Sequence, residues 1–341
     1  MKWPMPRILL IVLCLLTSVA HAAGSQLLRV PPSDGRPALT GMVWYPCADD
    51  IGASAAGAAA RNGARCPMRG DALPLVVISH GSASSFGAHY DTAEALAEHG
   101  FVVAAINHPG DTTNDESEIG SLSALLVDRP ADMKRLIDFM LTGWHDAARL
   151  DPRRIGFFGF SRGALTGLII AGGKPELSRM IVECENEPTW GVCQNPILPR
   201  RPLPRDARIR AMVLADPVFG AIFASGLAGV TIPVQLWASE YGGDGMSPSD
   251  VEAVARGLPE KPAYFVVPRA AHFAFIAPCD RASMEAVPRI CNDGEGFDRI
   301  RFHQAFNARV VGFFEQTLRD PRPAATPGVG QPRAQNETSR T

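Results

Sequence analysis

Short, nearly continuous apolar runs recur along this chain, and they constrain its fold more than any other feature. Runs of this kind are typical of strands that are buried on both faces of a parallel sheet. We expect strands at residues 39–45, 73–79, 101–106, 154–160, 210–215, 233–238 and 263–267. Amphipathic stretches alternate with them and predict helices at residues 91–99, 130–141, 163–171 and 302–318. This alternation predicts an α/β fold, with a mostly parallel central sheet flanked by helices.

A single domain accounts for the pattern. The chain has 341 residues, and α/β units of about 250 residues commonly form one domain. We expect the domain to span residues 23–320, with a Pro- and Cys-containing insertion at 173–208 close to the active site. The tail at 321–341 has no periodicity, and we expect it to be disordered.

The N-terminal segment, residues 1–22, has the features of an export signal. Lys2 and Arg7 precede and adjoin the apolar run 8–16, and an AHA motif ends at Ala22, after which we expect cleavage. The run is shorter than the roughly 20 residues that a transmembrane helix needs. We therefore expect a periplasmic or secreted protein without stable membrane insertion; the alternative is an uncleaved membrane anchor.

Cysteine usage agrees with export. Of the seven cysteines, Cys14 lies in the signal segment, and an even number remains in the mature chain. Cysteines of exported proteins usually form disulfides. Pairing each cysteine with its neighbour along the chain is the simplest arrangement, because each pair brackets one loop: Cys47–Cys66, Cys184–Cys193 and Cys279–Cys291. No C-x-x-C spacing is present, so we expect no metal site.

The charge pattern bears on the class of partner. The formal net charge is −2, and Lys and Arg are not clustered along the sequence. Nucleic-acid binding usually requires a basic patch or stripe. We therefore expect no nucleic-acid partner, and no oligomeric state follows from the sequence.

Residues 159–163 (GFSRG) match the G-x-S-x-G pattern of a nucleophile elbow. The motif is short enough to occur by chance, so its context decides. Here it follows an expected strand and precedes an expected helix, which is the setting that the motif requires. Its glycines allow a tight turn that lifts the serine hydroxyl clear of the sheet. We predict that Ser161 is a nucleophile.

A serine hydroxyl needs a base to become nucleophilic. His272 follows the last expected strand, where the chain order serine, acid, histidine places the base. The other histidines of the mature chain lie on expected helices or in other connecting segments. We predict that His272 is the base.

Two aspartates are candidates for the acid that orients the histidine. Asp216 lies at the carboxyl end of an expected strand, where a buried carboxylate is costly without a partner. Asp244 lies in the Gly-rich loop after the following strand. We favour Asp244 over Asp216, with Glu240 as a weaker alternative. Their non-catalytic interpretations are a turn cap for Asp216 and a solvated turn for Asp244.

Acyl transfer also needs donors for the developing oxyanion. The backbone N–H of Arg162, directly after the nucleophile, is one candidate. The second is the backbone N–H of Ser82, because Gly81 before it lets the backbone approach a substrate closely. We expect His80 to support this loop and not to act as a base. The predicted chemistry needs no cofactor.

At these residues the chain resembles the dienelactone-hydrolase-like branch of the α/β-hydrolases, and is similar to bacterial relatives of platelet-activating-factor acetylhydrolase. The resemblance lies in residues 76–82 (VVISHGS), 106–110 (INHPG), 158–164 (FGFSRGA), 234–240 (VQLWASE) and 271–279 (AHFAFIAPC). It implies an α/β-hydrolase fold and a serine ester or acyl hydrolase without a cofactor.

The chain departs from these relatives in its nucleophile, and the resemblance leaves the position of the acid open. True dienelactone hydrolases use a cysteine nucleophile, whereas this chain has Ser161, so activity on dienelactones is not implied. Acetylhydrolase relatives place the acid at the position of Asp216. Other relatives place it in an acid-x-x-x-Pro pattern, which Asp244 and Pro248 match.

The function predicted from the sequence is hydrolysis of a small carboxylic ester through a covalent acyl-enzyme. A peptidase, thioesterase or acyltransferase would use the same residues. A binding protein that has kept a hydrolase fold is an alternative of another class, but the complete set of serine, histidine and acid argues against it. We expect the insertion 173–208 and the loop 280–298 to border the pocket and to set substrate preference.

Overall fold

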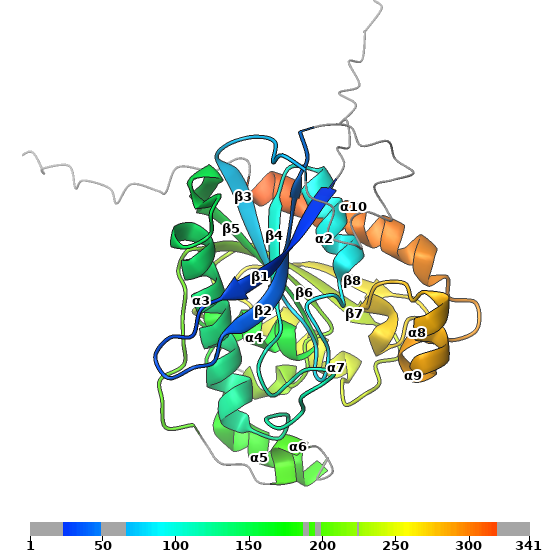
Figure 1. The fold of residues 1–341 in the computed structure, drawn as a ribbon. Coiled ribbons are helices and arrows are strands. Elements are labelled where there is room, and N and C mark those ends of the chain that lie inside the picture. The colour runs from blue at the N-terminus through cyan, green and yellow to red at the C-terminus, as the bar shows by residue number, and fades with distance from the viewer. Residues whose placement is uncertain (1–22, 49–65, 187–190, 195–198, 224, 319–341) are drawn as a thin grey trace, which may run out of the picture.

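The computed structural model describes residues 23–48, 66–186, 191–194, 199–223 and 225–318 (Figure 1). The expected signal segment and the expected C-terminal tail at 321–341 lie outside the described residues, as does part of the insertion.

An eight-stranded sheet forms the centre of the molecule, in the order β1-β2-β4-β3-β5-β6-β7-β8. Its strands are β1 (Ala23–Val30), β2 (Leu39–Pro46), β3 (Leu73–Ser79), β4 (Val102–Ile106), β5 (Leu150–Phe160), β6 (Ile209–Ala215), β7 (Val234–Ser239) and β8 (Ala263–Val267). β1 pairs antiparallel with β2, and β2 pairs antiparallel with β4. All pairs from β4 to β8 are parallel. The predicted mostly parallel sheet is confirmed.

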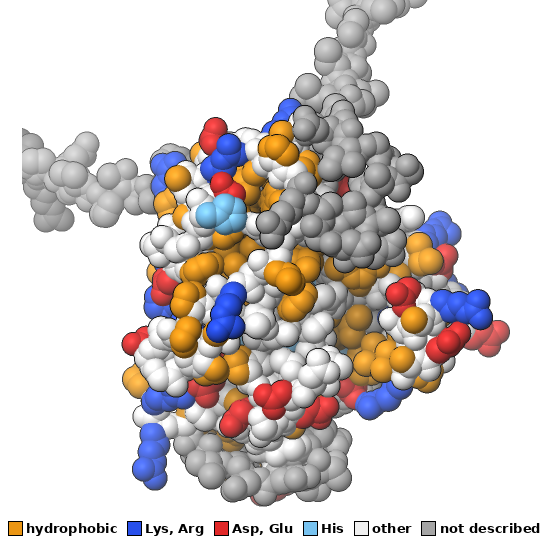
Figure 2. All heavy atoms as spheres, viewed as in Figure 1, with side chains coloured by type: hydrophobic (Ala, Val, Ile, Leu, Met, Phe, Trp, Pro, Cys, Tyr) orange, Lys and Arg blue, Asp and Glu red, His pale blue; other side chains and the backbone are white. Residues whose placement is uncertain are grey.

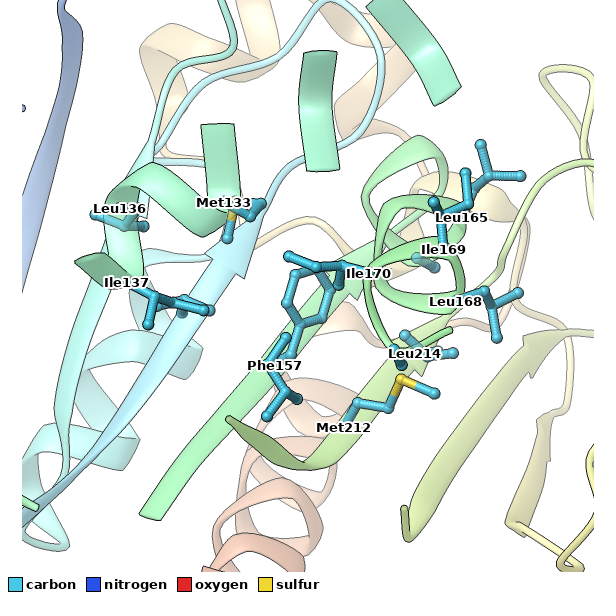
Figure 3. Close-up of a cluster of buried hydrophobic side chains, with 14 of the residues drawn as sticks. Met133, Leu136, Ile137, Phe157, Leu165, Leu168, Ile169, Ile170, Met212 and Leu214 are labelled. Atoms are coloured by element: carbon cyan, nitrogen blue, oxygen red, sulfur yellow. The ribbon is translucent and has the colours of Figure 1, made fainter. Parts of the chain in front are cut away.

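Helices cover both faces of this sheet (Figure 1). The longer ones are α2 (Tyr90–Glu98), α3 (Arg129–Thr142), α4 (Arg162–Ile170), α7 (Pro248–Gly257) and α10 (Arg299–Leu318). Alternate residues of a strand point to opposite faces, and on β5 Phe157 packs with α3 and α4 while Phe158 packs with α2 and α10. Figure 3 shows the first of these two cores, between α3, α4, β5 and β6.

Shorter helices lie at the periphery and are tied by disulfides. They are α5 (Leu177–Asn186), α6 (Gly191–Gln194), α8 (Arg281–Ala286) and α9 (Pro288–Cys291). Cys184–Cys193 joins α5 to α6, and the two helices lie together at one end of the molecule (Figure 1). Cys279–Cys291 joins the segment before α8 to the end of α9, and Cys47–Cys66 follows β2. These are the neighbour pairings that the sequence favours.

β1 was not predicted from the sequence, because this edge strand alternates between buried and exposed positions only in its second half. Helix α7, which begins with a Ser247 capping box, was not predicted either. Within the described part of the chain, no helix is long and apolar enough to cross a bilayer. On the face drawn in Figure 2, the described Lys and Arg side chains are scattered among acidic ones.

The topology determines where a site can form. Because the strands from β4 to β8 run parallel, their carboxyl ends meet at one edge of the sheet, and the loops that follow them converge there. Ligands of open α/β sheets bind in the crevice outside these carboxyl ends.

Candidate active site

Ser161 occupies a tight turn between β5 and α4. Its φ angle is +56°, which is unusual for a residue with a side chain. A Cβ atom at Gly159 would come within 2.3 Å of the Gly163 carbonyl oxygen, and one at Gly163 within 1.9 Å of the Ser79 carbonyl oxygen. Both glycines of the motif are therefore required by close backbone approach.

Ser161, His272 and Asp216 form a continuous hydrogen-bonded series. His272 Nε2 lies 3.0 Å from Ser161 Oγ, and His272 Nδ1 lies 3.1 Å from Asp216 Oδ2. The imidazole is held further by the Phe160 ring, which stacks on it at 4.6 Å between centroids. The His272 backbone N–H donates to the Gly242 carbonyl at 2.8 Å. The histidine ring is thus fixed between a hydroxyl and a carboxylate.

Asp216 is completely buried at the end of β6. Both of its oxygens accept hydrogen bonds from Ser239 at the end of β7: the backbone N–H at 2.7 Å and the hydroxyl at 2.6 Å. These bonds offset the cost of burying a carboxylate. They also leave Oδ2 directed at His272.

Asp244, the acid favoured from the sequence, does not hold His272. The backbone N–H groups of Gly243 and Met246 each donate to the backbone carbonyl of the other residue, which makes a tight turn. The Asp244 carboxylate forms an ion pair with Arg289. Glu240 accepts from the Arg269 backbone N–H at 2.6 Å. The preference for Asp244 over Asp216 is therefore corrected: Asp244 pairs with Arg289 at the pocket, and the strand end directs Asp216 at the histidine.

A pocket of about 160 Å³ opens beside the serine. It is lined by Ser82, Ser161, Arg162, Gly191, Val218, Phe219, Asp244 and Gly245. Gly191 comes from α6, so the insertion borders the pocket. The loop 280–298 reaches the rim through Arg289, which pairs with Asp244.

The fold of the chain is similar to that of two solved structures. The chain is similar to a ferulic acid esterase from Streptomyces cinnamoneus, with a TM-score of 0.59 and 21% identity over 91% of this chain and 95% of that one. It is also similar to a dienelactone hydrolase from Anabaena variabilis, with a TM-score of 0.50 and 16% identity over 87% of this chain and 100% of that one. The chain has the α/β-hydrolase fold. No protein-family model and no curated protein matches its sequence.

Among the described residues, eight non-glycine residues have positive φ angles, and five of them lie in or next to the pocket or in the series that starts at Ser161. Besides Ser161, positive φ angles occur at Ala83 (+48°), Asp216 (+45°), Phe219 (+57°) and Asp244 (+52°). Each such residue costs about 1–3 kcal/mol unless its surroundings impose the conformation. Three of these five residues line the pocket directly, and Asp216 contacts His272. The fold therefore stores backbone strain where the side chains converge.

A buried polar layer lies beneath the loop after β3. His80 Nδ1–H donates to the Gly81 carbonyl at 2.6 Å, while His80 Nε2 accepts from the His108 backbone N–H at 3.2 Å. Burial, together with the nearby Arg129 cation, lowers the pKa of both histidines well below the ordinary value. Both imidazoles are therefore neutral, and His80 supports the loop as expected from the sequence.

Asp111 and Arg129 belong to the same layer and were not predicted from the sequence. Arg129 is 2% exposed and forms an ion pair with Asp111 at 2.7 Å between Nη1 and Oδ2. Asp111 follows the INHPG segment directly, which is the signal that could have drawn attention to it.

Two further buried histidines anchor the loop that carries His272. His303 Nε2 lies 2.8 Å from the Ala274 carbonyl and its Nδ1 lies 2.7 Å from Asp91 Oδ2. His89 Nδ1 lies 3.2 Å from the Phe275 carbonyl, and burial lowers the pKa of His89 to about 4. The His272 loop is thus held from behind by side chains of α10 and of the segment that leads into α2.

Proposed function

We propose that this α/β-hydrolase is a serine hydrolase that cleaves carboxylic esters through an acyl-enzyme. The observation that carries the proposal is the series from Ser161 Oγ through His272 to Asp216, with spacings of 3.0 Å and 3.1 Å, at the wall of a pocket. Ser161 is the nucleophile, His272 the general base and Asp216 the acid that orients it.

The reaction proceeds in two halves. His272 Nε2 takes the Ser161 hydroxyl proton as Oγ bonds to the ester carbonyl carbon, and the carbonyl oxygen becomes an oxyanion. The oxyanion accepts from the backbone N–H groups of Ser82 and Arg162, whose residues line the pocket beside Ser161. The imidazolium then protonates the departing alcohol oxygen, which leaves an acyl group on Ser161.

In the second half, water replaces the alcohol. His272 takes a proton from the water, whose oxygen attacks the acyl carbon, and the carboxylic acid leaves as the proton returns to Ser161 Oγ. The Asp216 carboxylate stabilises the imidazolium in both halves. No cofactor enters either half.

The pocket limits the substrate. A cavity of about 150 Å³ holds a benzene ring, and the pocket here measures about 160 Å³. Val218 and Phe219 supply its apolar wall. We propose substrates that place one ring or one short chain in the pocket. Because one of the similar structures is a ferulic acid esterase, ferulic acid esters belong in the screen beside short-chain p-nitrophenyl esters.

We also propose that the protein works outside the cytoplasm, after cleavage behind Ala22. Three disulfides among the described residues fit an oxidising compartment. Mass spectrometry of protein from the periplasm and the medium should find a chain that begins at Ala23.

A fluorophosphonate probe tests the proposed reaction, because it bonds to serines that a base activates. We expect an adduct on Ser161, located by mass spectrometry, and none on Ser161→Ala. Asp216→Asn should react far more slowly than Asp244→Asn. A folded, disulfide-bonded protein that forms no adduct would instead be a binding protein on a hydrolase fold.

A further inference from the structure

We propose that Asp111 is a positioning residue that fixes both halves of the oxyanion site. The inference rests on the proposed function, since it concerns the Ser82 and Arg162 donors. Asp111 is 2% exposed, and it is not among the residues that line the pocket. It therefore acts through other residues and not on the substrate.

The loop after β4, which carries Asp111, braces the loop after β3, which carries Ser82. β3 and β4 are parallel neighbours, so both loops leave the same edge of the sheet. The Phe86 backbone N–H donates to Asn107 Oδ1 at 2.8 Å, and the Thr113 backbone N–H donates to the Ser84 carbonyl at 3.0 Å. Asp111 lies between these two links along its loop.

The first half of the site is held by Asp111 Oδ1. It accepts from the Ala83 backbone N–H at 2.7 Å and lies 3.4 Å from the Ser82 hydroxyl. This bond anchors the peptide unit on one side of Ser82, at a residue whose φ angle is +48°. On the other side of Ser82, His80 holds the Gly81 carbonyl. Because a peptide unit is planar, these two anchors fix the direction of the Ser82 N–H.

The second half of the site is reached by Asp111 Oδ2. It lies 3.4 Å from Arg162 Nη1, and the same guanidinium donates to the Ile119 carbonyl at 2.7 Å. Arg162 begins α4 directly after the nucleophile, so its side chain ties the start of that helix to Asp111. One carboxylate thus bonds to the residues of both proposed oxyanion donors.

Arg129 keeps this carboxylate in place. Its Nη1 lies 2.7 Å from Asp111 Oδ2, and its Nη2 donates to the His80 carbonyl. Burial by itself raises the pKa of Asp111, but the Arg129 and Arg162 cations bring that pKa well below its usual range. Asp111 therefore remains ionised, and each of its bonds is assisted by charge.

The test compares Asp111→Asn with Asp206→Asn. Asp206 is a matched control: it is 5% exposed, accepts a backbone N–H at 3.0 Å and pairs with Arg208. It precedes the amino end of β6, at the edge of the sheet opposite the site. Asp111→Asn retains the shape of the side chain but replaces the carboxylate that pairs with Arg129 by a neutral amide.

We expect kcat of Asp111→Asn for a p-nitrophenyl ester to fall about 10- to 100-fold, with KM within about threefold, because a displaced donor affects mainly the transition state. Fluorophosphonate labelling of Ser161 should slow by a similar factor. Asp206→Asn should keep kcat within about twofold. Circular dichroism and thermal unfolding establish that both variants are folded.

The outcomes separate the inference from the function. If the folded native protein takes no adduct, the proposed function fails and this inference with it. If the native protein reacts and Asp111→Asn keeps the native kcat, or changes KM alone, the inference is overturned and the function stands. If Asp111→Asn does not fold, the double variant Asp111→Asn/Arg129→Met also removes the buried Arg129 cation, which would otherwise lack a carboxylate partner. Native kcat in that double variant overturns the inference equally.

Discussion

The described part of the chain contains two hydrogen-bonded series of serine, histidine and aspartate. In one, Ser161 Oγ lies 3.0 Å from His272, which lies 3.1 Å from Asp216. In the other, Ser79 Oγ lies 2.9 Å from His108 Nε2, and His108 Nδ1 lies 3.3 Å from Asp132 Oδ2. Residue types and spacings are nearly the same, so they cannot be what distinguishes the two.

Access and charge distinguish them. Ser161 borders the pocket, whereas Ser79 ends β3 with no exposed surface. Ser79 Oγ also lies 3.3 Å from Arg129 Nη2, and this cation helps to lower the pKa of His108. His108 cannot become an imidazolium beside it. A triad of residues is therefore a catalytic candidate only where substrate reaches the serine and the histidine can hold a proton.

Replacing the two serines should give the largest contrast. Ser161→Ala removes the nucleophile and should lower kcat by about 10⁴- to 10⁶-fold. Ser79→Ala should keep kcat within about tenfold while it lowers the free energy of unfolding by about 1–3 kcal/mol, because Arg129 and His108 lose a buried partner. Ester hydrolysis and urea unfolding measure the two effects. Equal activity losses would mean that the buried series takes part in the reaction.

The two aspartates should differ next most strongly. Asp216→Asn removes the carboxylate that orients His272 and should lower kcat about 10⁴-fold. Asp132→Asn, on α3, should change kcat less than tenfold, because Asp132 contacts His108 and the guanidinium groups of Arg36 and Arg135. Steady-state kinetics at pH 8 on both variants measures the difference. A comparable loss of kcat in Asp132→Asn would mean that the buried series also supports the reaction.

The comparison of the two series also explains which site residues could be predicted from the sequence. Ser161 was predictable because a strand, a G-x-S-x-G turn and a helix follow one another locally. His272 was predictable because chain order places it after the last strand. The choice between Asp216 and Asp244 was not local: it depends on Ser239, a strand away, which holds the Asp216 carboxylate.

The buried polar layer around Arg129 could not be predicted from the sequence either. Arg129 lies on an amphipathic helix, where a guanidinium normally faces water, yet it is 2% exposed. Its partners come from the ends of β3, from the loop after β4 and from α4. Such a set forms only when the sheet brings these segments together. Central strands such as β3 and β4 were predictable for the opposite reason, since burial on both faces makes them almost entirely apolar.

The pH dependence of stability should report on Asp132, the carboxylate of the buried series. Burial raises the pKa of Asp132 to about 7, against about 4 in an unfolded chain. Between these values the folded protein binds a proton that the unfolded chain releases, so this carboxyl costs stability progressively as pH rises from about 4 to 7. Above pH 7 the cost is constant, at up to about 4 kcal/mol.

The neutral buried histidines act in the opposite direction below about pH 6.5, because their pKa values are lowered. The quantity to measure is therefore the difference in unfolding free energy between the native protein and Asp132→Asn. Relative to the variant, the native protein should lose stability from pH 4 to pH 7. A difference that does not change with pH would show that Asp132 ionises normally.

The smallest expected effect concerns the access of substrate to Ser161, which the buried series of Ser79 lacks. Gly191 of α6 lines the pocket, and a Cβ atom there would lie 3.4 Å from Gly120 Cα, 3.7 Å from Gly120 N and 3.9 Å from the Ile119 carbonyl carbon, which are ordinary contacts. Gly191→Val should therefore fold normally and narrow the pocket. We expect kcat/KM for a ferulic acid ester to fall about tenfold, and that for p-nitrophenyl acetate to stay within about threefold.

Gly312 on α10 provides the control for that change, since a Cβ atom there meets nothing within 4 Å. Gly312→Ala should leave both esters unaffected. If Gly191→Val slows the two esters equally, the insertion does not select substrates by size, and access to Ser161 is set by Val218 and Phe219 on the opposite loop. If it slows only the larger ester, the insertion selects substrates by size through Gly191 of α6, which a disulfide joins to α5.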